Sequence, residues 1–331
     1  MKTVSRFIWL LAIASAAGCA KSSNTRLEPQ VDPAPSPTVS PTPHPTLGPT
    51  PIPSPSPNPN ASPNPVACDP TALKEFAGVS AFAGTSAKFE GMNLSHGAVA
   101  PSITLDFVDL GYGLGRDGGR YDVVGDTVDL RDVTVENGGV AYASSIKFHE
   151  GVDVFGLVKK TTVVDYATVK ARAIALRAKL LARPANGTVA MVCNGGSPCR
   201  AVLKGTDPKV NRFTLTVAQM NQLKRNSKIA VDVPKHAAAV VVLQATSLAF
   251  DDIKVDSPAE TVWIVAGAGG TFKLDSLTLT GTVLAPESSV EMDSALVMGR
   301  VISDAFTSAS CSGDSVCATI DSQEMPDAIC L

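Results

Sequence analysis

Gly281-Thr282-Val283-Leu284-Ala285 and, 18 residues later, Gly299-Arg300-Val301-Ile302-Ser303 are the phrases that best indicate how this 331-residue chain folds. Each begins with glycine and continues with small or branched apolar residues, and weaker copies occur at His96-Gly97-Ala98-Val99-Ala100 and Gly138-Gly139-Val140-Ala141. Glycine permits tight corners, and a repeat of this length is typical of stacked parallel coils. The repeat therefore predicts a mainly β chain folded as a β-helix or β-solenoid.

Alternating apolar and polar residues predict short strands over most of residues 78–155 and 210–306. The period of two is clearest in Thr127–Val135 and in Phe272–Thr280. Short strands separated by turns would also suit an antiparallel sandwich, so that fold stays open as the alternative.

One segment departs from this alternation and predicts a single α-helix beside the strands, from Asp165 to Arg183. Asp165 is the candidate N-cap, and Pro184 follows the end. The apolar face of this helix consists of Tyr166, Val169, Ala173, Leu176 and Leu180. A shorter helical turn is expected near Val217 to Lys224.

The first residues have the layout of a secretory signal. Lys2 and Arg6 precede an apolar run, Phe7–Ala17, which is too short to span a bilayer. The following Ala16-Ala17-Gly18-Cys19 resembles the lipobox that lipoprotein signal peptidase cleaves before the cysteine. We therefore expect residues 1–18 to be a lipoprotein signal peptide and Cys19 to carry the lipid. Ordinary secretion, with Cys19 as an odd thiol, is the alternative.

Residues 19–66 are expected to form a lipidated, proline-rich, disordered stalk, because they consist largely of Pro, Ser, Thr and Asn. Proline favours extended polyproline II, so such a spacer would reach on the order of 100 Å. By resemblance to known sorting rules, an inner-membrane lipoprotein would have Asp at the position of Ala20. We expect an outer-membrane lipoprotein, exposed at the surface of the cell envelope, whose domain is residues 67–331.

Composition argues against nucleic acid as a partner. The formal net charge is −3, and no run of Lys or Arg is interleaved with aromatic residues. The membrane, through the lipid anchor, is one expected partner.

Six cysteines remain after Cys19, and in an oxidising compartment an even number indicates three disulfides. Sequence alone does not choose among the possible pairings. Flexible, glycine-containing loops favour the local pairs Cys193 with Cys199 and Cys311 with Cys317, which leaves Cys68 to pair with Cys330. A zinc site formed by the two local pairs is the alternative, although their spacing is wider than that of common zinc ligands.

No arrangement of residues indicates catalysis, and no cofactor or metal is expected. Asp251, Asp252 and Asp256 would offer carboxylates for acid–base chemistry on a strand face, but a polar turn explains them as well. The glycines of Val265–Thr271 are not followed by a helix, so they do not form a phosphate-binding loop. The glycine-rich stretch Gly111–Gly119 lacks the spaced carboxylates of a calcium loop.

Thr278, Thr280 and Thr282 form a short ladder of hydroxyls that would order water or ice on a flat strand face. Ice binding needs such a ladder repeated over many coils, and the next coil offers Leu296, Met298 and Arg300. Ordinary solvent-facing positions are therefore the preferred interpretation.

Residues 76–306 resemble the choice-of-anchor A family of bacterial surface domains. Three groups of phrases carry the resemblance: Ser80–Phe89 with Asn93–Ala100; the helix from Asp165 with Phe213–Val217; and Thr261–Val265 with Leu279–Pro286 and Met298–Ser303. This sequence departs from the family at Glu287, where Asn is usual, and at His96-Gly97-Ala98, where an acidic residue, Gly and Arg are usual.

The resemblance implies a β-solenoid with an adjoining helix and an adhesive role, and some relatives bind collagen. We therefore expect a non-catalytic adhesion protein whose ligand is an extracellular protein of the collagen kind or a glycan. The alternatives are a carbohydrate-active enzyme on a β-helix and a purely structural envelope protein.

Overall fold

The computed structural model describes residues 72–76, 78–111, 121–194, 197–223, 225–308, 318–322 and 331. They lie in one compact unit, Ser56–Leu331, which contains both described hydrophobic clusters and so carries its own core. The expected signal peptide, Cys19, the stalk and the stretch 112–119 lie outside the described residues. No described helix is long and apolar enough to cross a membrane.

The described residues are mainly β, as predicted. The helices are η1 (Lys74–Phe76), α1 (Tyr166–Ala182) and α2 (Val217–Met220). The strands are β1 (Val79–Leu94), β2 (Gly97–Val99), β3 (Ser102–Leu110), β4 (Tyr121–Val135), β5 (Gly139–Phe148), β6 (Asp153–Val154), β7 (Val158–Lys160), β8 (Thr188–Val192), β9 (Arg200–Lys204), β10 (Val210–Leu215), β11 (Lys228–Asp232), β12 (Ala238–Leu243), β13 (Leu248–Asp251), β14 (Lys254–Asp256), β15 (Thr261–Val265), β16 (Thr271–Asp275), β17 (Thr278–Thr280), β18 (Thr282–Asp293), β19 (Leu296–Met298), β20 (Val301–Ser308) and β21 (Ala318–Asp321).

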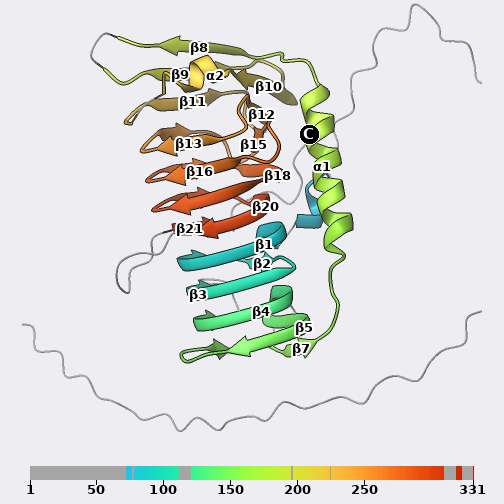
Figure 1. The fold of residues 1–331 in the computed structure, drawn as a ribbon. Coiled ribbons are helices and arrows are strands. Elements are labelled where there is room, and N and C mark those ends of the chain that lie inside the picture. Colours follow the sequence, from blue (N-terminus) through green and yellow to red (C-terminus); the bar gives the residue numbers. More distant parts are fainter. Residues whose placement is uncertain are drawn as a thin grey trace, which may run out of the picture. The chain divides into compact units, whose positions relative to one another are not determined.

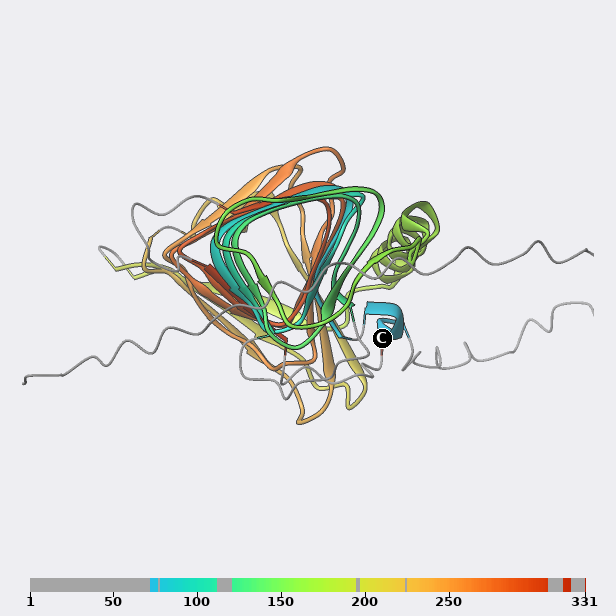
Figure 2. The same cartoon turned by 90° about the horizontal axis from the view of Figure 1, so that it is seen from below.

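Parallel pairing stacks the strands into coils that superpose in a three-sided outline (Figure 2). The helix face lies under α1 and consists of β10, β12, β15, β2, β7 and the first parts of β18, β20, β1, β4 and β5. The open face consists of β13, β16, the first part of β3 and the later parts of β18, β20, β1, β4 and β5. The split face consists of β8, β9, β11, β14, β17, β19, β21, β6 and the ends of β1, β3 and β4.

The coils do not stack in chain order (Figure 1). From β1 the chain descends to β7, α1 runs back along the stack, and β8 begins a second series of coils at the opposite end. The second series returns to β20, which pairs in parallel with β1: Ala81–Ala83 lie beside Val301–Ser303, and Ser86–Lys88 beside Ala305–Thr307. This seam between β1 and β20 joins the two series into one stack.

Side chains connect the two sides of the seam. The rings of Phe89 and Phe306 stack with their centroids 4.7 Å apart in the interior. Ser308 Oγ accepts a hydrogen bond from the Glu90 backbone N–H at 2.6 Å and donates to the Glu90 carbonyl at 3.0 Å. The first and last coils are therefore packed as tightly as neighbours within one series.

Where the corner lies among the described residues, each coil turns from the open face to the split face at a residue with positive φ. The interior residues on either side of this corner follow the spacing i, i+2, i+5, i+7, as in Phe272, Leu274, Leu277 and Leu279. The predicted run Phe272–Thr280 is therefore not one straight strand, because it bends at Ser276, where φ is 53°. The equivalent corner residues are Gly91, Phe107, Asp132, Gly151, Asp252, Ser276 and Ser294.

The glycines of the sequence repeat stand where the split face meets the helix face. A Cβ atom at Gly281 would lie 2.3 Å from the Thr261 carbonyl oxygen, and one at Gly299 would lie 1.9 Å from the Gly281 carbonyl oxygen. Both distances are far below van der Waals contact, so only glycine fits where neighbouring coils approach this closely.

Helix α1 forms where it was predicted. The Asp165 carboxylate caps it by accepting hydrogen bonds from the Thr168 backbone N–H at 3.1 Å and the Thr168 hydroxyl at 2.7 Å, which lowers the pKa of Asp165. Ala173 and Leu180 are buried against the helix face, in one hydrophobic cluster with strand residues of both series. The predicted apolar face is confirmed.

The polar anchor of α1 was not predicted from the sequence. Arg177 is buried on this helix, donates from Nε to the Val265 carbonyl at 2.9 Å and pairs through Nη1 with Glu287 Oε2 at 2.6 Å. Its Nη2 also donates to the carbonyls of Ala266 and Gly267. Glu287, which departs from the choice-of-anchor A pattern, thus provides the carboxylate that pairs with Arg177 of the helix.

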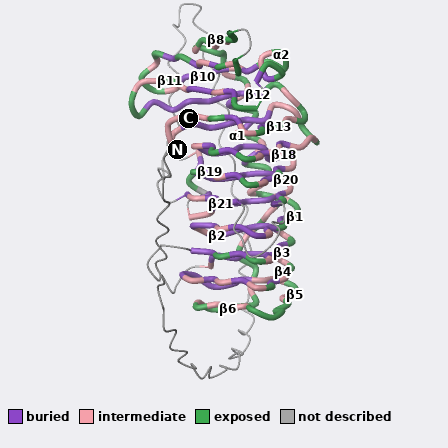
Figure 3. The backbone as a smooth tube through the Cα atoms, turned by 90° about the vertical axis from the view of Figure 1, so that its left-hand side faces the viewer, coloured by how far each residue is buried: buried purple, intermediate pink, exposed green. Residues whose placement is uncertain are grey.

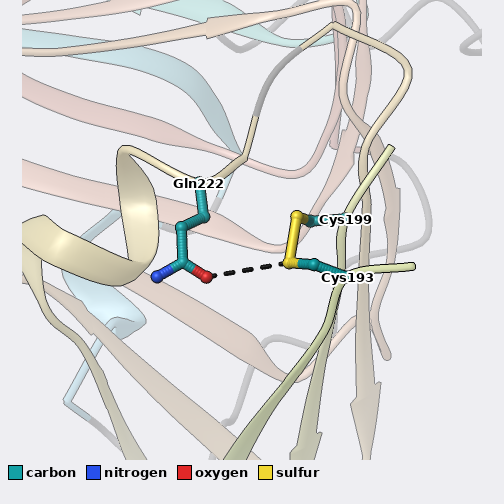
Figure 4. The surroundings of a disulfide bond; sticks show 3 residues. All are labelled: Cys193, Cys199 and Gln222. Carbon is teal, nitrogen blue, oxygen red and sulfur yellow. Dashed lines mark hydrogen bonds between the residues drawn. A yellow bond between two sulfur atoms is a disulfide. The ribbon is translucent and has the colours of Figure 1, made fainter. Parts of the chain in front are cut away.

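The disulfide between Cys193 and Cys199 is present, as predicted (Figure 4). It closes the turn between β8 and β9, the one antiparallel pair among the described strands, and Gln222 Oε1 lies 3.7 Å from Cys193 Sγ. Cys68, Cys311, Cys317 and Cys330 lie outside the described residues, so their pairing stays a prediction.

Replacing Arg177 by methionine should lower the free energy of unfolding by about 3 kcal/mol, because Glu287 and three carbonyls lose a charged donor. Arg177→Lys keeps the charge but not the planar fork, so its loss should be smaller. Urea denaturation of both variants measures this. Equal stability of Arg177→Met and the parent would contradict the anchoring role.

Candidate binding face

The open face is the one side of the stack that is both uncovered and continuous among the described coils. Helix α1 covers the helix face (Figure 2). The split face is interrupted, because β14 pairs only with β11 and β17 only with β19 among the described strands. On the open face, hydrogen-bonded register runs from β13 to β5 without a break.

A column of hydroxyl groups runs along the open face. Register places one small side chain at the same position of every coil, and seven of the eight are serine or threonine: Ser247, Thr271, Ser289, Ala305, Ser86, Ser102, Thr127 and Ser145. Thr127 Oγ1 donates to Ser102 Oγ across one rung at 3.2 Å. Neighbouring strands lie about 4.8 Å apart, so the column presents hydroxyls at that interval.

Two further outward columns carry charge. The middle column contains Ala249, Lys273, Glu291, Thr307, Lys88, Thr104, Asp129 and Lys147, and the column at the corner contains Asp251, Asp275, Asp293, Glu90, Asp106, Arg131 and His149. Lys88 Nζ lies 2.7 Å from Glu90 Oε2, and Asp129 accepts from His149 Nε2 at 2.8 Å. The face therefore combines hydroxyls with paired charges.

Phe107 is an exposed aromatic ring at the edge of this face. It stands at the corner after Asp106, 53 % of its surface is accessible, and its φ is 54°. Positive φ is unfavourable for a bulky residue, and the same position holds glycine at Gly91. A strained, exposed aromatic residue beside a polar face indicates a role in contact rather than in folding.

The open face also contains a shallow hollow of about 230 Å³. It is lined by Ser102, Thr104, Thr127, Asp129, Ser145 and Lys147 together with the interior residues Ile103 and Val128. A larger groove, of about 550 Å³, crosses the split face where β14 and β17 separate. Its polar lining residues are Asp252, Lys254, Ser276, Thr278, Ser294 and Thr319, and its apolar ones are Ile253, Val255, Leu277, Ala295 and Leu296. Hydroxyl and charged groups dominate the hollow of the open face, whereas polar and apolar groups share the lining of the groove on the split face.

The carboxylates considered for catalysis do not form one site. Asp251 belongs to the corner column of the open face, Asp252 pairs with Arg225 at 3.2 Å, and Asp256 lies 3.6 Å from Lys228. Among the described residues no group of three or more His, Cys, Asp or Glu side chains is arranged to hold a metal ion.

The threonines considered as a ladder lie on two different faces. Thr278 and Thr280 are on the split face in register with Leu296 and Met298, as expected for the next coil. Thr282 is buried on the helix face, because the chain turns at Gly281. The hydroxyl column of the open face was missed, although each of its members directly precedes the first interior residue of the i, i+2, i+5, i+7 spacing, as Ser102 precedes Ile103.

Comparison with known proteins identifies the family. A family model described as "Putative Ice-binding-like adhesive domain" matches residues 80–313. The chain belongs to this family. No curated protein matches it.

Two solved structures are similar to this member of the ice-binding-like adhesive family. One is an ice binding protein from an Antarctic biological consortium, with 14% identity and a TM-score of 0.40 over 80% of this chain and 95% of that one. The other is an ice-binding protein from the Antarctic ascomycete Antarctomyces psychrotrophicus, with 13% identity and a TM-score of 0.32 over 78% of this chain and 100% of that one.

Proposed function

We propose that this protein is a lipid-anchored, non-catalytic adhesion module of the cell surface, a parallel β-solenoid whose open face binds an extended polar polymer. The hydroxyl column in register over eight coils is the observation that carries the proposal. Membership of the adhesive family supports the binding role. The phrases that resemble choice-of-anchor A domains favour that family as the finer assignment.

A glycan fits the chemistry of the open face better than a protein of the collagen kind. Hydroxyls both donate and accept hydrogen bonds, and the flanking carboxylates and lysines supply further acceptors and donors for sugar hydroxyls. The ring of Phe107 offers an apolar surface at the edge of the same columns. Contacts repeated at about 4.8 Å would each be weak and would add along a polymer.

Ice is a second candidate, because the hydroxyl column is regular and similar structures are ice-binding proteins. The adjoining columns oppose it. Lys88, Lys147, Lys273 and Glu291 project from the same face, and charged groups keep their own hydration shells in place of an ordered water layer. We therefore favour the glycan.

Removing hydroxyls should separate binding from folding. The variant Ser86→Ala, Ser102→Ala, Thr127→Val and Ser145→Ala is expected to lose at least about tenfold in affinity for a bound polysaccharide, because four hydrogen-bonding groups are lost.

Phe107→Gly should also weaken binding while leaving stability unchanged or improved, since it relieves the positive φ. Surface-sensor titration against a panel of polysaccharides and collagen measures both.

Met298→Ala, an exposed position on the split face, is the matched control and should bind like the parent. Affinity for collagen alone, retention of full affinity by the hydroxyl variant, or arrest of ice growth by the parent domain would each contradict the glycan proposal.

The proposed anchor is tested separately. Cys19→Ser should shift the protein from the outer-membrane fraction to the soluble fraction, because one cysteine would carry all of the acyl chains. Ala20→Ser, which leaves the cysteine intact, should stay in the membrane fraction. Unchanged fractionation of Cys19→Ser would contradict lipid anchoring at this residue.

A further inference from the structure

The lower end of the stack, residues 139–163, is here called the terminal coil, and its outermost strand segments are paired on one side only. Within the described structure β7 pairs only with β5, and β6 pairs only with β4 (Figures 1 and 3). The Ser145–Phe148 part of β5 pairs only with β4. Strand edges of this kind are templates for pairing with another chain.

Exposed apolar side chains concentrate in the terminal coil. Nine large apolar side chains are exposed in the described structure, and five of them belong to this coil: Phe148, Phe155, Leu157, Val158 and Val163. Leu157 is the most exposed of them, at 64 %. Clusters of exposed apolar residues mark interaction sites in soluble proteins.

The charges of the terminal coil are divided between two faces. Glu150 lies at the corner beside Gly151 that leads to the split side and Asp153 lies on that side, whereas Lys159 and Lys160 lie on the helix side, and all four side chains are exposed. None of the four forms an ion pair with another described residue. The coil thus has one acidic side, one basic side and, between them, the strand of the open face.

The other end of the stack differs. There β8 reverses direction against β9, and the Cys193–Cys199 disulfide closes the turn between them. Only one exposed large apolar side chain, Val192, is found in this hairpin among the described residues. Among the described strands β8, β10 and β13 are also paired on one side only, so the concentration of exposed apolar side chains, rather than its strand edges, distinguishes the terminal coil from this end.

From the divided charges and the open strand edges we propose that the terminal coil is the interface for a second copy of this chain, in a two-fold, end-to-end dimer. A two-fold axis through the middle of the open face would turn that face onto itself and exchange the other two faces. The acidic side of each copy would then meet the basic side of the other, twice. A closed two-fold interface of this kind is self-complementary.

The same axis places the Ser145–Phe148 edges of the two copies antiparallel to each other. It also brings the exposed apolar side chains of the terminal coil into the interface between the two copies. Lys147, which both copies bring to this edge, lies 3.9 Å from Asp129 of its own chain and so carries a counter-charge. The two open faces become coplanar, with the hydroxyl columns of the two copies on opposite sides of the axis, which doubles the length of the proposed binding face and would raise the avidity for a polymer.

Sedimentation velocity of residues 56–331 tests the dimer. The parent unit is expected to dimerise reversibly in the micromolar range, and Leu157→Glu with Val158→Glu should weaken association at least about tenfold. Val192→Glu, which changes an exposed apolar residue at the capped end, is the matched control and should dimerise like the parent. Circular dichroism checks that each variant is folded.

Charge reversal tests the predicted geometry. Lys159→Glu with Lys160→Glu, and separately Glu150→Lys with Asp153→Lys, should each remain monomeric, whereas an equal mixture of the two variants should form mixed dimers. A parent unit that stays monomeric, a dimer unaffected by Leu157→Glu with Val158→Glu, or reversed variants that fail to combine would overturn the proposal.

Discussion

Parallel pairing of β1 with β20 is the constraint on which the rest of the structure depends. The first described strand, β1, lies in the middle of the stack, so neither series of coils has a complete interior until the seam closes. At the seam the ring of Phe89 packs on that of Phe306. The Ser322 hydroxyl extends the contact through hydrogen bonds with the Ser80 hydroxyl and with His96 Nδ1. Helix α1 spans both series and buries its apolar side against their strands, so it stabilises the same closed arrangement from outside.

Short-range features were predictable because their causes are local. Asp165 caps α1, the repeat glycines stand where a Cβ atom would meet the neighbouring backbone, and Cys193 reaches Cys199 across one turn. The seam was not predictable, because alternation shows that a strand exists and not which distant strand it joins. The partnership of Arg177 with Glu287 was missed for the same reason, since the two residues are 110 positions apart.

The candidate face was only partly predictable. The threonines considered as a ladder were expected on one flat strand face, yet they lie on two different faces, because the chain turns at Gly281. The interval of three residues between i+2 and i+5 contains the corner. Outward residues before the corner therefore lie on the open face, and those after it lie on the split face. Read in this way, the sequence contains the hydroxyl column, the paired charges and the strained Phe107 as parts of one surface. The corners and the parallel register that form the stack therefore also align the side chains of the proposed binding face.

Hydrogen exchange measured by mass spectrometry tests the closed seam most directly, because amides that open together share one free energy of opening. The account predicts that Val79–Leu94 and Val301–Ser308 are protected to the same degree and lose protection in one cooperative step as denaturant is added. Early exchange of the coils from β1 to β5, while those from β12 to β20 stay protected, would contradict it.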